Sequence, residues 1–194
     1  ENIQRDLNIA LMNEIYKVCE SSKINFENVI KLAKTKWNFV PFKPGLVGGH
    51  CLPVDPYYFS YFAKKRGIKT NIVLAGRKTN NEMPNFFYNK ILKKLKNIKN
   101  ISHKKIIILG ITYKKNVSDL RNSLAVKVYK RLKRKYRSIK VYDPYIDIRF
   151  SKKYDLIKKE KLKNFNIYIV LTNHDVFSEI KKDLKIKNII DPYS

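Results

Sequence analysis

The chain has 194 residues, of which 44% are hydrophobic, enough for one large domain or two small ones with a real core. It shows no apolar run near the roughly 20 residues that a membrane helix needs, and no secretory signal pattern, so we expect no membrane insertion and a cytoplasmic location. Cys19 and Cys51 are the only two cysteines, too few for a disulfide scaffold.

The formal net charge of +26 first suggests a nucleic-acid-binding protein, because clustered Lys and Arg provide the field that attracts phosphates. The cations are spread almost evenly from Lys17 to Lys187, however, and most are Lys rather than the Arg favoured for phosphate and base contacts. This distribution favours a solvated surface over a nucleic-acid face, so we expect no nucleic-acid partner. A modest positive field would still help to capture an anionic nucleotide.

The first 20 residues predict an amphipathic helix. Their apolar side chains recur at intervals of three or four residues and so form one stripe along the helix. Cys19 borders this stripe, and we expect its thiol to be buried and inert. The stripe consists of Ile3, Leu7, Leu11, Ile15 and Val18.

Further helices are expected in the first half of the sequence, together with one long loop. Asn25 is placed to cap the second helix, and Gly67 is placed to end the third. Prolines and glycines force a loop over about residues 36–54. The helices are expected at residues 26–33, 56–65 and 81–96.

The second half of the sequence alternates between strands and helices. The run KKIIILGITY is continuously apolar after its charged start, which is typical of a strand buried on both faces. The segment SLAVKVYKRLKRKY predicts an amphipathic helix, and SIKVYDP, NIYIVLT and KNIIDP predict three more strands. This alternation predicts an α/β unit with a Rossmann-like parallel sheet over residues 104–194.

The stretch PGLVGGHCLPVDPYY, residues 44–58, places three of the six glycines directly before a cysteine. Glycine admits positive φ and lets backbone amides approach a ligand. Cys51 would then lie in an open concavity of N–H donors, as a nucleophilic thiol requires; the alternative is a tight turn in which it only packs. Asp55 precedes Pro56, which favours a helix N-cap, and it could also hold a water beside the sulfur. Such a cap would bring the thiol near a helix N-terminus, where the dipole favours thiolate.

The strand that ends at Gly110 lacks the G-x-G-x-x-G fingerprint, and no other stretch supplies it, so the residues alone do not support a dinucleotide site. Asp143 follows the next strand, where an acidic residue often meets a ribose hydroxyl, but its separation from Gly110 exceeds the usual distance of roughly 20 residues. Lys114 and Arg121 follow the first strand and are either phosphate ligands or two of 42 solvated cations. The three histidines are too scattered to assign a metal site.

Several stretches, in this order, resemble the UDP-glucose/GDP-mannose dehydrogenase family, and within it the UDP-N-acetylhexosamine (GlcNAc, GalNAc or ManNAc) 6-dehydrogenases. Members have an N-terminal NAD-binding Rossmann domain, a central helical dimerisation region and a C-terminal Rossmann-like UDP-binding domain. The chain resembles the last two, with the central region at residues 1–98 and the UDP-sugar-binding domain at 99–194. The stretches are ENIQRDLNIALMNE, TKWNF, PGLVGGHCLPVDPYY, LAGRKTN, YKKNVSDLRNS and VYDP.

The resemblance implies a role for individual residues. Cys51 matches the catalytic nucleophile, which forms a thiohemiacetal and then a thioester at the sugar C6. Asp55 matches the aspartate that assists water activation, and Asn2 matches an asparagine that stabilises the oxyanion. The matching binding residues are Gly48 and Gly49 near the sugar, Tyr113 and Lys114 for the substrate, and Arg121 towards the cofactor NAD.

The sequence also departs from the family pattern. The family's catalytic lysine would lie four residues before Asn2, outside this chain, and the glutamate base and the glycine-rich loop are missing as well. We therefore expect a longer parent protein and no catalysis by this polypeptide alone. Pro53 stands where close relatives often carry glycine, and the last strands expected of the C-terminal domain are missing after IIDPYS.

The resulting hypothesis is an NAD-dependent, four-electron oxidation of a UDP-N-acetylhexosamine to a uronic acid, which would supply polysaccharide precursors. We expect the enzyme to be a homodimer through its central helices. UDP-glucose remains possible as the substrate. The alternative is a non-catalytic module that binds a UDP-sugar and dimerises.

Overall fold

A computed structural model describes residues 1–193, and the side chains of all of these except Ile148. The chain divides into two compact units, Glu1–Met83 and Pro84–Ser194. This division falls inside a helix. The domain limits expected at residues 98 and 99 stay a prediction.

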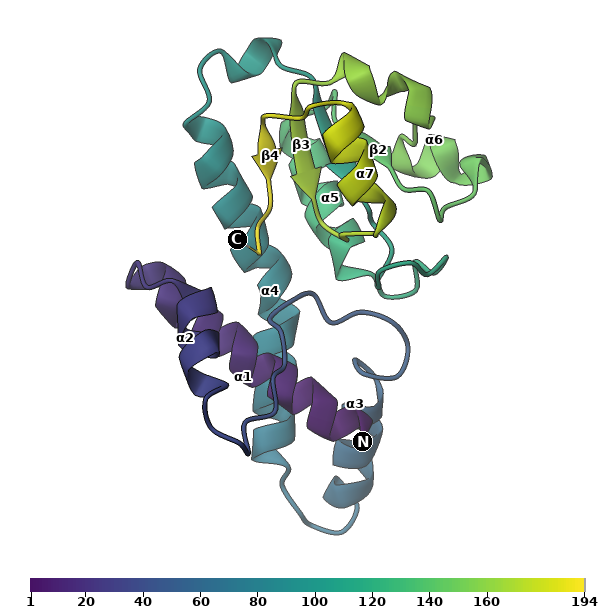
Figure 1. Cartoon of the computed structure of the whole chain (residues 1–194). Coiled ribbons are helices and arrows are strands. Elements are labelled where there is room, and N and C mark those ends of the chain that lie inside the picture. The colour runs from purple at the N-terminus through teal and green to yellow at the C-terminus, as the bar shows by residue number, and fades with distance from the viewer. Residues whose placement is uncertain (194) are drawn as a thin grey trace. The chain divides into compact units, whose positions relative to one another are not determined.

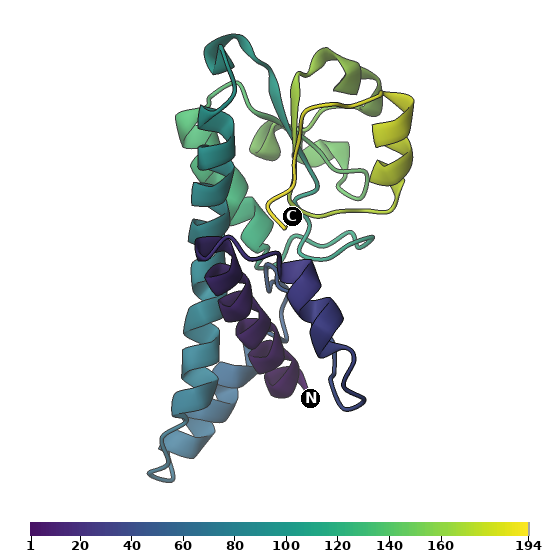
Figure 2. The ribbon, with the colours of Figure 1, turned by 60° about the vertical axis from the view of Figure 1, so that its left-hand side comes forward.

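The first unit is helical, and its helices largely follow the predicted ranges (Figure 1). Helix α1 packs closely on the first half of α4, because Gly76 of α4 has no side chain: a Cβ there would lie 2.5 Å from Cδ2 of Leu7. Figures 1 and 2 both show α1 against this part of α4. The helices are α1 (Asn2–Ser21), α2 (Phe26–Ala33), α3 (Asp55–Lys64) and α4 (Asn71–Lys96), of which the last continues into the second unit.

The predicted helix ends are confirmed for α2 and α3. The Asn25 side chain accepts a hydrogen bond of 2.9 Å from the Asn28 N–H, as an N-cap does. Gly67 has φ +73° just beyond the end of α3, which is the left-handed conformation that favours glycine. Helix α4, in contrast, begins at Asn71 rather than near residue 81, because Gly76 lies at a close helix contact instead of interrupting the helix.

The apolar stripe expected on α1 does not form its buried face. Leu11 is 52% exposed and Val18 is 60% exposed. The buried face includes two polar side chains, whose partners come from other segments of the unit. Cys19 is buried, as predicted. The buried residues of α1 are Asp6, Ala10, Met12, Asn13, Tyr16 and Cys19.

The second unit contains the predicted Rossmann-like parallel sheet, which is confirmed. Its strand order is β2-β1-β3-β4, and every neighbouring pair is parallel. The chain therefore runs from β1 outwards to β2 and then returns to the other side of β1, so the order reverses between β1 and β3. The strands are β1 (Ile106–Leu109), β2 (Lys140–Tyr142), β3 (Ile167–Val170) and β4 (Ile189–Ile190).

Helices cover both faces of this sheet, with α5 (Leu124–Lys135) on one side and α7 (Val176–Asp183) on the other (Figures 1 and 2). A short helix, α6 (Ser151–Tyr154), precedes β3. Since side chains alternate across a strand, each strand contributes apolar groups to both layers. The apolar cluster that includes side chains of α7 comprises Ile107, Leu109, Tyr142, Leu162, Tyr168, Val170, Phe177 and Ile180.

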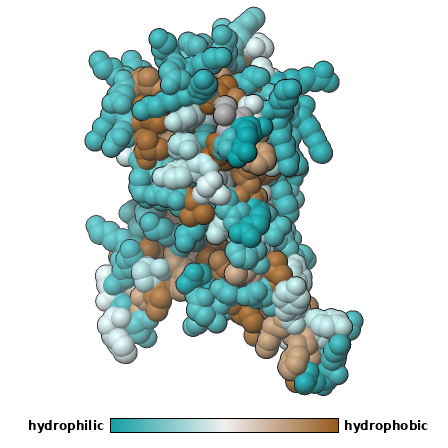
Figure 3. All heavy atoms as spheres, turned by 90° about the vertical axis from the view of Figure 1, so that its right-hand side faces the viewer, coloured by the Kyte–Doolittle hydropathy of each residue, from teal (hydrophilic) through white to brown (hydrophobic). Residues whose placement is uncertain are grey.

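The surface is predominantly hydrophilic on the face shown in Figure 3, with hydrophobic side chains scattered among the hydrophilic ones. This agrees with cations distributed along the whole sequence rather than gathered in one segment. Among the described residues, no helix is both long enough and apolar enough to cross a membrane.

Candidate functional site

The loop before Cys51 exposes the cysteine to solvent and buries the two glycines nearest to it. Residues 39–48 form neither helix nor strand. Gly48 and Gly49 are buried, whereas Cys51 is exposed. Gly49 has φ +90°, a conformation that side chains with a Cβ rarely adopt. The thiol is therefore accessible from solvent, at the end of a segment that requires glycine at one position.

Asp55 does not cap α3, so this prediction is wrong. The helix begins at Asp55 itself, and Val54 is the N-cap residue, without a side-chain cap. Instead, the Cys51 carbonyl accepts hydrogen bonds from the N–H groups of Val54 (3.0 Å) and Asp55 (2.8 Å), which makes the cysteine part of the turn that leads into the helix.

The structure brings together two of the predicted catalytic residues. The Nδ2 amide of Asn2, at the start of α1, donates a 2.6 Å hydrogen bond to Oδ2 of Asp55. Asp55 lies in the first turn of α3, near the positive end of the helix dipole. An oriented carboxylate thus stands four residues along the chain from an exposed thiol, within the same turn. This arrangement suits chemistry in which a water is positioned beside a sulfur-bound group.

Behind this loop lies a polar network that the sequence did not reveal. Asp6 and Arg77 form an ion pair of 2.5 Å, and each side chain is 1% exposed. Nδ2 of Asn80 donates to Asp6 Oδ1 (2.7 Å), and Nδ2 of Asn13 donates to Asn80 Oδ1 (2.8 Å). Asn13 in turn exchanges two hydrogen bonds with the backbone of Gly45. The network therefore runs from the interior of the unit to the cysteine loop.

The charged end of this network is strongly desolvated. Burial raises the pKa of Asp6 above its usual range; the positive charge of Arg77 and hydrogen bonds from Asn80 and Arg77 oppose the rise without cancelling it. Asp6 Oδ2 and Arg77 Nε are buried and have no hydrogen-bond partner among the described residues. A signal was present in the sequence: polar residues at positions 6 and 13, and at 77 and 80, recur at helical spacing.

In the second unit, the carboxyl ends of β1 and β3 lie at the point where the strand order reverses, which is where ligands bind in open parallel sheets. Gly110 follows β1 with φ +77°. A Cβ on Gly110 would lie 2.1 Å from the backbone oxygen of Thr172, so no larger residue fits there without movement of the backbone. The two chain segments can approach this closely only because the residue is glycine.

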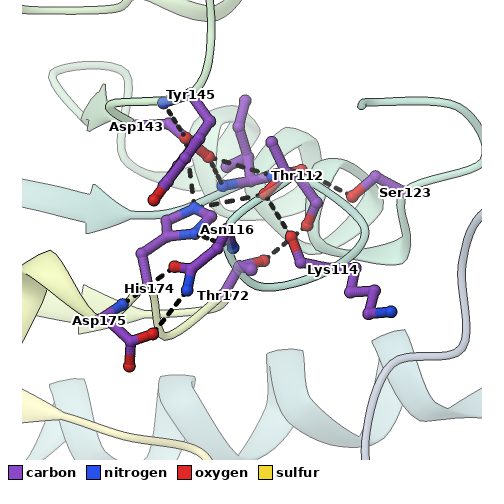
Figure 4. A network of polar contacts seen from close by, with 10 residues as sticks. Thr112, Lys114, Asn116, Ser123, Asp143, Tyr145, Thr172, His174 and Asp175 are labelled. Atoms are coloured by element: carbon purple, nitrogen blue, oxygen red, sulfur yellow. Dashed lines mark hydrogen bonds and ion pairs between the residues drawn. The ribbon is translucent and has the colours of Figure 1, made fainter. Parts of the chain in front are cut away.

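A buried network joins the loops at this edge of the sheet (Figure 4). Asp143 Oδ2 accepts hydrogen bonds from the N–H groups of Ile111 (2.7 Å) and Thr112 (3.1 Å). Asp143 Oδ1 accepts from the Tyr145 N–H (3.0 Å) and lies 3.2 Å from His174 Nε2. The Asp143 side chain is fully buried. The ribose-binding role considered for this residue is therefore wrong, because its oxygens already hold protein groups.

His174 connects this network to the loop after β1. Its Nδ1 accepts the Asn116 N–H at 2.9 Å, which leaves the proton on Nε2, facing Asp143 and the hydroxyl of Thr112. Since both ring nitrogens are engaged with the protein and the side chain is buried, this Asp–His–Thr cluster is a structural brace rather than a hydrolytic triad. The sequence analysis gave no indication of this role for His174.

The predicted binding residues of the second unit lie on the loop that this brace holds. Tyr113 is half-buried and Lys114 is exposed, with its backbone carbonyl bound by the Thr112 hydroxyl at 3.1 Å. Arg121 is 65% exposed and forms a fork with Asp119, with Nη2 and Oδ2 2.7 Å apart. The Lys114 side chain is thus presented on a loop whose backbone is fixed, whereas Arg121 already has a carboxylate partner.

Two further features bear on ligands. A cavity of about 470 Å³ lies between α3 and the start of α4, but its lining does not include Cys51, Asp55 or Asn2. Its lining includes Tyr57, Tyr61 and Leu74. No group of three or more His, Cys, Asp or Glu side chains within residues 1–193 is placed to hold a metal ion.

A helical unit with an exposed cysteine, followed by a parallel sheet whose strand order reverses between β1 and β3, defines an α/β protein with a Rossmann-like sheet. Two family models match the chain: the UDP-glucose/GDP-mannose dehydrogenase family central domain over residues 1–82, and the UDP binding domain of the same family over residues 107–194. The chain belongs to this family.

Curated proteins and solved structures agree with this assignment. The chain is 38% identical over 184 residues to UDP-N-acetyl-D-glucosamine 6-dehydrogenase of Salmonella typhi, with 93% of the chain and 43% of that protein covered. It is 37% identical over 202 residues to UDP-N-acetyl-D-mannosamine dehydrogenase of Methanococcus vannielii, with 98% and 45% covered. The UDP-N-acetyl-mannosamine dehydrogenase Cap5O of Staphylococcus aureus matches with a TM-score of 0.79 and 30% identity, with 99% and 45% covered. The chain spans less than half the length of these relatives.

Proposed function

We propose that this chain supplies the catalytic cysteine and the UDP-binding domain of an NAD-dependent UDP-N-acetylhexosamine 6-dehydrogenase. The observation that carries the proposal is the hydrogen bond from Asn2 to Asp55 in the same turn as the exposed Cys51, in a chain that matches the central and UDP-binding domains of the family. The reaction would convert the C6 alcohol of the sugar to a carboxylate, a precursor for polysaccharides.

Cys51 would act as the nucleophile between the two oxidations. Its thiolate adds to the C6 aldehyde, the S–C6 bond forms, and the carbonyl oxygen takes a proton to give a thiohemiacetal. Loss of a hydride from C6 and of the hydroxyl proton gives a thioester. Water then attacks C6, the S–C6 bond breaks, and the thiolate leaves as the carboxylate forms. The covalent bond keeps the aldehyde from escaping before the second oxidation.

Asp55 and Asn2 fit supporting roles in these steps. An oriented carboxylate can accept a proton from the water that attacks the thioester. The Asn2 amide, which in this structure donates to Asp55, is a donor that could stabilise the oxyanion formed at C6. Gly48 and Gly49 would leave room for the sugar, because neither residue carries a side chain.

The nucleotide would be held in the second unit. Lys114 provides an exposed cation for the diphosphate, and Tyr113 provides an aromatic surface on the same loop. Arg121 would extend towards the cofactor, which requires exchange of its Asp119 partner for the cofactor.

NAD would accept the two hydrides. The described residues form no G-x-G-x-x-G turn, and the turn after β1 contains Gly110 alone, held against Thr172. Hydride transfer itself is therefore not assigned to residues of this chain.

We also propose a homodimer formed through the central helices in the cytoplasm. Leu11 and Val18 support this assembly, because they lie two turns apart on α1 and are more than half exposed. Replacing both with Lys should convert the dimer to a monomer in sedimentation experiments. An unchanged dimer would place the interface elsewhere.

The nucleophile is tested by Cys51→Ser in the protein that catalyses the reaction. We expect uronate formation to fall by at least roughly a thousand-fold, because a serine hydroxyl without a dedicated base is a poor nucleophile. Binding of the UDP-sugar, measured by calorimetry, should stay within about threefold. Cys19→Ser provides the matched control, since that thiol is buried in α1 and should affect activity only through stability.

The outcomes separate the proposal from its alternative. Full uronate formation by Cys51→Ser would overturn the nucleophile assignment. Binding of UDP-sugar without oxidation by the intact, unsubstituted protein would support a non-catalytic UDP-sugar-binding module instead. Comparing UDP-GlcNAc, UDP-GalNAc, UDP-ManNAc and UDP-glucose in the same assay identifies the sugar.

A further inference from the structure

The loop that carries Cys51 is held in place by a side chain from another element. Residues 39–48 have no regular secondary structure. Oδ1 of Asn13 on α1 accepts the Gly45 N–H at 2.7 Å, and Nδ2 of the same amide donates to the Gly45 carbonyl at 3.1 Å. One buried amide therefore satisfies both backbone groups of a residue that lies shortly before the cysteine.

The orientation of this amide is set by a charged group further inside. The Asp6 carboxylate can only accept hydrogen bonds, so Asn80 must turn its NH₂ group towards it, where it donates to Oδ1 (2.7 Å) and to the Asp6 backbone carbonyl (2.9 Å). The Asn80 carbonyl then faces Asn13 and accepts a bond from its NH₂ group at 2.8 Å. Both protons of the Asn13 NH₂ group are then used, one by the Asn80 carbonyl and one by the Gly45 carbonyl. The Asn13 oxygen is left to accept the Gly45 N–H.

Arg77 fixes the starting point of this chain of hydrogen bonds. Its Nη1 pairs with the same Asp6 oxygen at 2.5 Å, and its Nη2 donates to Asn81 at 2.7 Å. Asn81 in turn donates to the Tyr57 hydroxyl on α3, at 3.1 Å, so one side of the network also reaches the helix that begins at Asp55. Well-packed apolar residues stabilise a helix interface as well as a buried ion pair does. Apolar contacts have no preferred direction, whereas the hydrogen bonds of this network fix the orientation of each side chain.

We propose that Asn13 and Asn80, oriented by the Asp6–Arg77 pair, are positioning residues that set the place of the Cys51 loop. This inference rests on the proposed function for the role of Cys51 as nucleophile. The network does not touch the substrate. It determines where the backbone from Gly45 onwards lies, and a displacement of about 1 Å at a reacting atom can cost roughly 100-fold in rate.

The first test uses the 194-residue chain itself and does not depend on enzyme activity. Asn13→Asp keeps the size of the side chain and its acceptor for the Gly45 N–H, but it removes the two donated bonds. We expect the amide NMR resonances of Gly45, Gly48 and Gly49 to shift. Lowering the pH should move them back towards the wild-type positions, because protonation restores one donor.

Control variants distinguish a displacement of the loop from a general loss of the folded structure. Asn8→Ala removes the same type of side chain from α1, where Asn8 bonds the Gln4 carbonyl of its own helix at 2.8 Å, and it should leave the three glycines unchanged. Asn80→Ala breaks the chain of hydrogen bonds one step earlier and should shift Gly45 without a change at residue 45 itself. Circular dichroism and protection of Cys19 from alkylation report whether each variant keeps its fold.

The second test measures catalysis by the intact enzyme. In Asn13→Asp we expect kcat to fall roughly 10- to 100-fold, with KM for the UDP-sugar within about threefold, because the proposed nucleotide contacts lie elsewhere. Unchanged Gly45 resonances would overturn the network's control of the loop. Shifted resonances with an unchanged kcat would overturn the positioning role. If the intact protein has no dehydrogenase activity, the proposed function is contradicted, but the NMR shifts of the three glycines still test whether the network positions the loop.

Discussion

The two units of the chain place their buried polar groups differently. In Glu1–Met83, an ion pair and two amides lie between α1 and α4, in the middle of the helix packing. In Pro84–Ser194 the buried strand residues are apolar, and the buried polar groups gather at the carboxyl ends of the strands, around Asp143 and His174. Removing one partner from a buried polar pair costs far more than the intact pair contributes. The first unit therefore depends on the pairing of Asp6 with Arg77, whereas in the second unit the contact of Gly110 with Thr172 depends on close packing.

The largest effect is expected when the ion pair of the first unit is broken. Arg77→Met leaves the Asp6 carboxylate buried without its cation, and we expect the free energy of unfolding, measured in urea, to fall by about 3–5 kcal/mol. Arg66→Met is the control, because Arg66 is an exposed arginine at the end of α3, and its loss should cost less than about 1 kcal/mol.

The double variant Asp6→Leu with Arg77→Met sharpens this test. Replacing both charges with apolar groups should recover part of the lost stability, since no uncompensated charge remains. If Arg77→Met costs no more than Arg66→Met, the first unit does not depend on its ion pair, and the contrast between the units fails.

A smaller loss is expected from close packing in the second unit. Gly110 and Gly67 both have positive φ, but a Cβ at Gly110 meets the Thr172 carbonyl, whereas a Cβ at Gly67 meets nothing within 4 Å. We expect Gly110→Ala to lower the free energy of unfolding by about 2–4 kcal/mol and Gly67→Ala by about 1 kcal/mol. Equal losses in thermal or urea unfolding would show that strain in φ, rather than contact with Thr172, determines the cost.

The smallest effect concerns a polar group at the edge of the second unit. Asp155 is bound by Lys133 (3.0 Å), Lys140 (3.1 Å) and the Tyr129 hydroxyl (2.9 Å). Burial alone would raise the pKa of Asp155, but hydrogen bonds from Lys133, Lys140 and Tyr129 outweigh burial and hold the pKa below its usual range. Asp155→Asn should cost about 1 kcal/mol at neutral pH, since solvent screens these partly exposed charges.

The pH dependence of that loss has a definite sign. A carboxyl group whose pKa is lower in the folded state contributes stability above its unfolded pKa, about 3.9, and loses this contribution as the pH falls through the folded value. The difference between wild type and Asp155→Asn in thermal unfolding should therefore shrink below about pH 4. A difference that grows on acidification would contradict the assignment.

The sequence predicted the second unit better than the first for a physical reason. The strands β1 and β3 are buried on both faces, so each appears as an unbroken apolar run. On α1, the predicted apolar stripe did not include Asp6 and Asn13, which are buried. Their burial depends on Arg77 and Asn80, which are about 70 positions away and cannot be paired with them from helical periodicity.

The candidate site was predicted in part: the sequence identified its residues but not the contacts between them. The residues around Cys51 identified the loop and Asp55, and the resemblance to the family added Asn2. The hydrogen bond between Asn2 and Asp55 spans 53 positions, and the network behind the loop spans more, so neither follows from local patterns. The cap expected at Asp55 was wrong because its carboxylate binds Asn2 rather than the α3 backbone.

Helix α4 offers a way to separate the chain experimentally. The division between the units falls between Met83 and Pro84, at the midpoint of this 26-residue helix. Proline is well tolerated as the first residue of a helix, since the N–H group that it lacks would have no partner there. A recombinant segment that starts near Met83 should therefore begin with a competent helix end. We expect it to express as a folded domain suitable for measuring UDP binding on its own.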